Sequence, residues 1–240
     1  MRVARLGSRV QMRSALVLEV KRPYRLPPTP VSLAQIWQLG FPHAQLPAEV
    51  RQWRRKNLPN LWRGLWREAL ARMFHVAHFT GTLQLAHVFP DGQVVDFGLA
   101  SLRVITTVGV NAVSDAFQGT FTLSNFKFHG LGTGTAAEAA ADTTLGTELT
   151  TQYTTNNTRA TGTQTEGDGT GGTGTALAHV YRTVGENILD EAVTALTEWG
   201  LFSQAAAPGG TLFDRALFTA QSPSAGMTVK SIYDLTIQGS

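Results

Sequence analysis

Three β-type runs in the C-terminal part of the chain constrain the fold more than any other feature. They cover residues 192–203, 209–218 and 227–237, and short stretches of small residues separate them. β-branched and aromatic residues are common in these runs, as is typical of strands, and the glycines between them suit turns. The pattern predicts sheet that packs and presents a surface. It contains no arrangement of residues that is typical of a catalytic site.

Similar signals recur from Gly81 onward. Residues 82–89 and 93–99 predict a hairpin around the Pro90–Asp91–Gly92 turn, and 102–107 and 123–129 predict further strands. Apolar spacing predicts a helix over 109–118, and alanine content favours a short helix over 136–149. The remaining expected β segments are 150–167, 177–184, 188–202, 212–220 and 229–237, with a flexible exposed tip at 168–174. Many short strands with glycine-rich turns predict a mainly β fold, an antiparallel β-sandwich or jelly roll with a short helix.

Composition limits the chemistry that the chain can perform. Hydrophobic residues make up 42% of the sequence, which supports a real core, whereas charged residues make up only 15%. Few charges suit a surface that becomes buried in an assembly, because charges are costly to remove from water. Cysteine is absent, which excludes disulfides, thiolate metal sites and cysteine nucleophiles.

The charge is divided unevenly along the chain. Residues 1–72 contain 14 lysines and arginines against three acidic residues, whereas the rest of the chain is acidic overall. Such asymmetry indicates two segments with different tasks. We therefore predict a basic N-terminal extension over 1–74 and a β-sandwich domain over 78–240.

The N-terminal extension is expected to be only partly helical. Prolines at positions 23, 27, 28 and 30 indicate that residues 1–45 are extended or disordered. Residues 59–74 predict a basic amphipathic helix whose tryptophans and leucines share one face. That helix suggests contact with a membrane surface, a nucleic acid or a partner protein. If Met73 is the natural start and the upstream segment is a translated leader or an over-extended gene prediction, the helix has no function. We favour the partner protein and the absence of function over the other two. No run has the length of a membrane span, and no secretion signal is visible.

Five segments occur in an order that resembles a family of small virion structural proteins of tailed bacteriophages. They are residues 128–135, 158–167, 181–185, 197–202 and 232–237, and the resemblance covers roughly 73–240. It implies a structural protein of the virion, in capsid decoration or in the tail or baseplate, which assembles in the bacterial host cytoplasm. It also implies a homo-oligomer that binds other virion proteins. Members of the family begin near His75, so Met73 is a candidate start and residues 1–72 depart from the pattern.

The sequence offers few candidate ligand sites. The glycine-rich segment 130–135 precedes the expected helix as a phosphate loop does, but it lacks the lysine of such loops, and we interpret it as an exposed turn. His75 and His78 have the spacing of a helical metal site, with His87, Asp91 and Asp96 downstream, but no further strong ligand follows. His129 and His179 have no visible partners. We therefore expect no metal, no cofactor and no small-molecule substrate.

Glu198 beside Trp199 is the best candidate for catalysis. A carboxylate in apolar surroundings is a possible acid, and glycoside hydrolysis would need a second one, from Asp190, Glu191 or Asp214. The structural alternative is an ion pair with Arg215 or Arg182 on a neighbouring strand, which we favour. We predict that the protein is not an enzyme. A carbohydrate-binding or carbohydrate-cleaving host-recognition module, in which Trp199 and Tyr181 stack on sugars, is the alternative function. Phe202, Phe213 and Phe218 are expected in the core, and loops 130–135 and 166–175 are expected on the surface.

Overall fold

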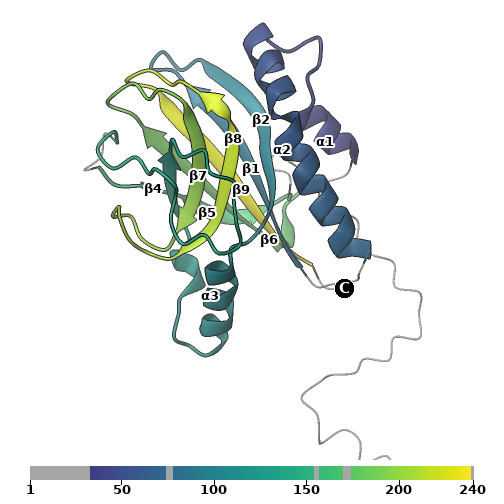
Figure 1. Cartoon of the computed structure of the whole chain (residues 1–240), viewed down its shortest axis with the longest axis vertical. Coiled ribbons are helices and arrows are strands. Elements are labelled where there is room, and N and C mark those ends of the chain that lie inside the picture. The colour runs from purple at the N-terminus through teal and green to yellow at the C-terminus, as the bar shows by residue number, and fades with distance from the viewer. Residues whose placement is uncertain (1–32, 74–77, 154–156, 170–173, 239–240) are drawn as a thin grey trace, which may run out of the picture.

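The structure, a computed structural model, describes residues 33–73, 78–153, 157–169 and 174–238. Two antiparallel sheets face each other, and helices lie along one side and at one end of the sandwich (Figure 1). The larger sheet has the strand order β2-β1-β9-β6-β5, and the smaller sheet has the order β4-β3-β7-β8. The predicted antiparallel, mainly β fold is therefore confirmed.

The elements follow one another in a simple order. The helices are α1 (Leu33–Gly40), α2 (Ala48–Met73), α3 (Thr107–Phe117) and the short 3₁₀ helix η1 (Leu123–Asn125). The strands are β1 (His78–Val88), β2 (Val94–Val104), β3 (Phe128–Gly132), β4 (Ala160–Thr161), β5 (Thr163–Gly167), β6 (Leu177–Ile188), β7 (Leu196–Phe202), β8 (Leu212–Gln221) and β9 (Thr228–Gln238).

The first hairpin forms where the sequence predicted it. Phe89 accepts a hydrogen bond from Gly92 N at 2.9 Å, and Gly92 has a φ of 85°, which favours glycine. The strands β1 and β2 pair from this turn to Thr80, with irregularities in register on the way. Of the separate strand expected over 102–107, only residues 102–104 are strand, as the end of β2, and Thr107 already begins α3. The predicted helix over 109–118 is also present as α3, and the Thr106 side chain caps it by accepting a bond from Gly109 N.

The main core lies between the two sheets. Trp199 of β7 is fully buried and stacks on Tyr233 of β9, with ring centroids 5.1 Å apart. Phe213 and Phe218 belong to this core, as expected. Phe202 is also buried, but it points to the opposite face of the smaller sheet and packs with other apolar side chains under the segment 133–148. The members of that second cluster are Leu145, Phe202, Leu212 and the half-buried Phe128.

The segment 136–149 contains no helix, so that prediction is wrong. It forms turns and bends that cover the outer face of the smaller sheet. Its backbone groups bond to other parts of the chain: Leu149 N donates to Leu131 O, and Ala136 O accepts from Arg215. These tertiary bonds satisfy backbone groups that a helix would pair internally, and they outweigh the modest helix propensity of alanine.

The region before β3 also differs from expectation. Residues 123–129 were expected to form one strand with Phe126 and Phe128 on one face. Instead η1 occupies its start, Phe126 enters the main core, and Phe128 begins β3 and joins the second cluster. The expected loop 130–135 is half strand, because β3 runs to Gly132 and pairs with β7.

The N-terminal region is more helical than the sequence indicated. Residues 33–40, which we expected to be extended, form α1, and α2 begins at Ala48 rather than near Pro59. Proline inside a helix costs about 3 kcal/mol, yet the helix continues through Pro59. Tertiary contacts on both sides of Pro59 explain this, because Asn57 and Leu61 are both fully buried against the sandwich.

Side chains of the helix α2 form hydrogen bonds with backbone groups of the edge strands of both sheets. Asn57 Nδ2 donates to Ala100 O of β2 at 2.8 Å, and its Oδ1 accepts from Thr219 N of β8 at 3.1 Å. Trp53 Nε1 donates to Thr219 O at 2.7 Å, and Arg54 Nε donates to Phe97 O at 2.8 Å. Unpaired backbone groups make an edge strand prone to aggregation, and here helical side chains pair them.

The same helix shares the core of the sandwich. Val50 and Trp53 belong to one apolar cluster with Leu83, Leu85 and Trp199. The predicted boundary between an extension ending at residue 74 and a sandwich starting at residue 78 therefore does not divide the packing. The helix α2 covers both β2 and β8 (Figure 1), so residues 48–73 have a structural role in the sandwich.

We predict that Asn57→Leu destabilises the protein by about 2–4 kcal/mol, because it leaves two buried edge groups without partners. The free energy of unfolding from urea denaturation measures this. Gln52→Leu, at an exposed position of the same helix, is the matched control and should change stability by less than about 0.5 kcal/mol. Equal effects of the two variants would contradict the edge-pairing role of Asn57.

Candidate functional site

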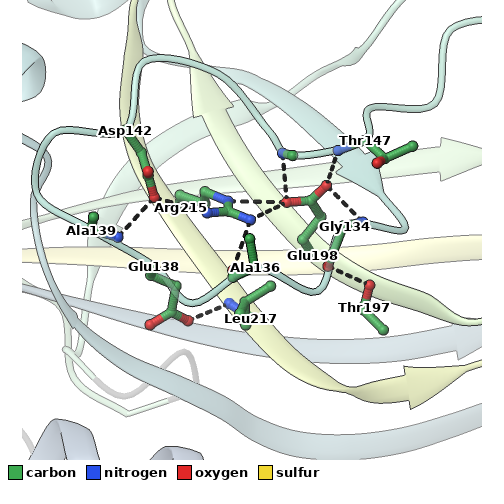
Figure 2. A network of polar contacts seen from close by, with 11 residues as sticks. Gly134, Ala136, Glu138, Ala139, Asp142, Thr147, Thr197, Glu198, Arg215 and Leu217 are labelled. Carbon is green, nitrogen blue, oxygen red and sulfur yellow. Dashed lines mark hydrogen bonds and ion pairs between the residues drawn. The ribbon is translucent and has the colours of Figure 1, made fainter.

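Glu198 lies in β7 and is fully buried beneath the segment 133–148. Its Oε1 accepts hydrogen bonds from Gly134 N at 2.9 Å and Thr147 N at 2.7 Å, and its Oε2 accepts one from Gly146 N at 3.0 Å. Figure 2 shows these three backbone groups converging on the carboxylate. Glu198 therefore holds both ends of the covering segment against the sheet.

Arg215 of β8 completes the network. Its Nε and Nη2 donate to Glu198 Oε2 at 3.0 and 2.8 Å, and its Nη1 donates to Asp142 Oδ2 at 2.8 Å (Figure 2). The register opposes Glu198 to Leu217, so Arg215 is a diagonal neighbour on the same face. The predicted ion pair with Arg215 is confirmed. Asp142 was missed, because it lies in the segment that we expected to be helical.

The glycines of 130–135 leave room for the Glu198 carboxylate of this network. A Cβ at Gly132 would lie 2.5 Å from Glu198 Oε1, and a Cβ at Gly134 would lie closer still. Neither residue has a positive φ, so the interpretation as a turn that needs a left-handed backbone is wrong. The residues are small because the backbone approaches the buried carboxylate. Gly130, Leu131, Gly132 and Gly134 are buried, which also contradicts an exposed loop.

This arrangement does not suit the catalytic interpretation of Glu198. Both carboxylate oxygens are occupied by donors, and Trp199 is fully buried, so it is not able to stack on a sugar. Asp190 and Glu191 are exposed in the loop before β7, and Asp214 lies on the inner side of β8, near Tyr233. None of these three carboxylates lies across a cleft from Glu198.

Two more arginines, the buried Arg159 and the half-buried Arg182, hold loops in the same way. Arg159 pairs with Glu148 and donates to the carbonyl oxygens of Gln204, Ala206 and Gly209. Its guanidinium also lies 3.5 Å from the centre of the Phe202 ring. The turn at 203–210 is thereby fixed to the segment that contains Glu148.

Arg182 of β6 joins the tip at 168–174 to the larger sheet. It pairs with Asp234 on β9 at 2.6 Å and with Asp168 at 2.7 Å. Asp168 in turn accepts a bond from Gly174 N at 2.7 Å. The start of the expected flexible tip is therefore anchored, and Asp168 is buried. The hydrogen bonds to Asp234 raise the pKa of Arg182.

The histidines do not gather into a metal site. His75 lies outside the described residues, His78 begins β1, and His179 is exposed on β6. Asp91 and Asp96 each accept a bond from the backbone two residues ahead. Among the residues that the structure describes, no group of three or more potential ligands could hold a metal ion.

His129 and His87 are buried in the sandwich. The Nδ1 of His129 accepts a bond from Trp199 Nε1 at 3.2 Å, which places the ring proton on Nε2, facing Thr183 Oγ1 at 3.1 Å. Burial lowers the pKa of His129 to about 3 and that of His87 to about 4. Both rings are therefore neutral at physiological pH and belong to the core.

The outward face of α1 and α2 carries an unusual set of aromatic side chains, which we call the tryptophan face. Trp37, Trp62 and Trp66 are 57%, 49% and 66% exposed, and Leu70 is 45% exposed. Phe41 links the two helices by stacking on Trp37 and contacting the edge of Trp62. Basic side chains accompany this face on the exposed side of α2. They are Arg51, Arg55, Lys56 and Arg63.

A groove of about 580 Å³ opens on the opposite side of the sandwich, beside β6. We call it the β6 groove. Its lining includes Thr161, Thr163, Thr165, Asn187, Ile188 and Lys230. Sequence reasoning did not identify it, because its walls come from strands that are far apart in the chain.

Comparisons with known proteins give no relative: no family model, no curated protein and no solved structure matches the chain. Among the described residues, no helix is both long enough and apolar enough to cross a membrane.

We predict that Glu198→Gln destabilises the protein by about 2–4 kcal/mol, because it leaves the buried Arg215 without its main counter-charge. Guanidinium denaturation measures the change. The control is Glu186→Gln, whose side chain is 55% exposed in an ion pair with Lys230, and it should cost less than about 1 kcal/mol. A stable Glu198→Gln protein with altered turnover of a sugar substrate would support catalysis instead.

The buried histidines predict a loss of stability in mild acid. Their folded pKa values lie below the unfolded value of 6.5, so only the unfolded chain takes up protons as the pH falls below about 6.5. Each ring then removes up to about 1.4 kcal/mol of stability per pH unit. The free energy of unfolding, measured between pH 7 and 5, should fall with this slope. His129→Gln should reduce the slope by the contribution of one titrating ring. An unchanged slope would contradict the neutral buried ring.

Proposed function

We propose that this protein is a non-catalytic structural protein of a bacteriophage virion, which attaches to other virion proteins and to copies of itself through the tryptophan face. The single observation that carries the attachment is the exposure of Trp37, Trp62 and Trp66 on the helices α1 and α2. Monomeric proteins rarely expose large apolar patches, and such patches mark interaction sites. Tryptophan and arginine are also the residues that most often dominate binding energy at protein interfaces.

Charge supports association between copies. The segment that carries the tryptophan face is strongly basic, whereas residues 73–240 contain 14 acidic residues against six basic ones. Complementary charge steers encounters and fixes the orientation of two partners. A basic helix of one copy placed on the acidic sandwich of the next makes a repeating contact between different surfaces, which builds rings or filaments.

The virion setting rests on the resemblance of five β segments within 73–240 to small structural proteins of tailed phages. Mass spectrometry of purified particles tests it. Tryptic peptides from both 33–73 and 78–238 should appear in the particle at equal stoichiometry. Particles that lack the protein, or that contain only its C-terminal part, would overturn the virion role or the attachment surface, respectively.

A carbohydrate-binding module is the second candidate, although not through the residues that the sequence suggested. Trp199 is buried, and the hydroxyl of Tyr181 bonds to Gln164 and to the backbone of Phe126. The β6 groove is the observation that keeps sugar binding as a candidate.

We predict that Trp62→Ser combined with Trp66→Ser weakens self-association at least about tenfold while leaving the fold intact, because both side chains are exposed in the single chain. Sedimentation velocity over a concentration series measures the association. Phe117→Ser is the matched control, since Phe117 is 89% exposed but lies on α3, away from α1 and α2. A wild-type protein that stays monomeric and does not bind particles would refute the proposed attachment.

A further inference from the structure

The chain path creates the β6 groove. β4 belongs to the smaller sheet, and after Gly162 the chain enters the larger sheet as β5. The pairing of β5 with β6 begins at Thr163 and Val184, whereas β6 continues to Ile188 beside β9. The last four residues of β6, 185–188, therefore have no β5 residue paired beside them. The resulting opening has about 580 Å³, within the range of small-ligand sites.

The lining of the β6 groove is polar, but its cationic side chains are paired with carboxylates. Three exposed threonines, Thr161, Thr163 and Thr165, offer hydroxyl groups that both donate and accept hydrogen bonds. Lys230 is paired with Glu186 at 2.9 Å, and the buried Arg159 is paired with Glu148. Because each cation has a carboxylate beside it, the groove suits a neutral ligand better than an anion.

Asn187 supplies a donor that the protein itself does not use. The residue is 2% exposed and lines the groove. Its Oδ1 accepts a bond from Ala160 N at 3.1 Å, which fixes the amide, whereas its Nδ2 has no hydrogen-bond partner. A buried amide donor without a partner costs free energy. Because Nδ2 is enclosed by protein atoms, the exposed threonine hydroxyls are the groups that a ligand in the groove reaches.

An apolar strip borders these polar groups. Ile188 is 45% exposed, and Val184 is half-buried on the same face of β6. A sugar ring presents hydroxyls at its edge and C–H groups on its face, and it matches this combination of threonine hydroxyls and aliphatic carbon. A peptide strand fits less well, because the uncovered part of β6 spans only residues 185–188.

From this geometry we infer that the β6 groove is a binding site for a neutral saccharide, held by the threonine hydroxyls. This inference is independent of the tryptophan face, because α2 bonds to the edge strands β2 and β8, whereas β5 and β4 form the opposite edges of the two sheets. A protein attached through α1 and α2 would leave the groove open toward solvent.

The test is calorimetric titration of the full chain with neutral trisaccharides of glucose, galactose, mannose and N-acetylglucosamine, at low and high salt. We expect one of them to bind with an affinity that does not change with salt, because no charge is neutralised. Thr163→Val with Thr165→Val should weaken that binding about tenfold or more, through the loss of two hydrogen bonds.

Thr135→Val is the matched control, because Thr135 is exposed but lies outside the groove. It should leave the affinity unchanged, and circular dichroism should show that all variants fold. The inference is overturned if no trisaccharide binds at millimolar concentration, if binding is insensitive to the groove variants, or if only acidic sugars bind and salt weakens them. Preferential binding of neutral extended peptides in the same titration would also overturn it.

Discussion

The buried ion pair between Arg215 and Glu198 is the interaction on which the arrangement of the smaller sheet depends. Burying two charges is costly, and the cost is offset only when nearly every oxygen and N–H finds a partner. Here the segment 133–148 supplies those partners, and in exchange its path is fixed over the sheet. Arg159 and Arg182 act in the same way on two other loops. The buried carboxylates therefore serve rigidity, which fits a protein that presents surfaces.

Edge strands set the second constraint. A two-sheet sandwich has edge strands on both sides, and in this protein the two sides are covered differently. On one side Trp53, Arg54 and Asn57 of α2 bond to the backbone of β2 and β8, so the helix is part of the domain. On the other side the short β4 and β5 cross between sheets and leave the β6 groove. The opposite face of α2 stays free for the tryptophans, so one helix both covers the core and presents a contact surface.

Much of the strand framework was predictable from local pattern. The strands beside the Pro90–Asp91–Gly92 turn and those of the C-terminal runs were predicted from their local residue patterns. The ion pair of Glu198 with Arg215 was one of two pairings predicted, because the two residues lie in adjacent strand-like runs and have opposite charges. The helix expected over 136–149 was wrong, because its carbonyl and amide groups bond to Arg215, Glu198 and Leu131. Asp142, Glu148 and Asp168 were missed as partners, since contacts between distant loops have no periodicity in the sequence. The orientation of α2 was also missed: the face of Val50, Trp53 and Asn57 is buried, whereas Trp62 and Trp66 point outward.

The sequence by itself determined the β class, the first hairpin, the helix α3 and the uneven charge, because each depends on residues that are neighbours in the chain. The tertiary structure alone decided which face of α2 is buried, which carboxylate meets which arginine, and where the groove opens. These features depend on how two sheets are stacked and how the chain crosses between them. Local propensities carry no information about such stacking, since it is fixed by side chains that are more than a hundred residues apart, as Asn57 and Thr219 are.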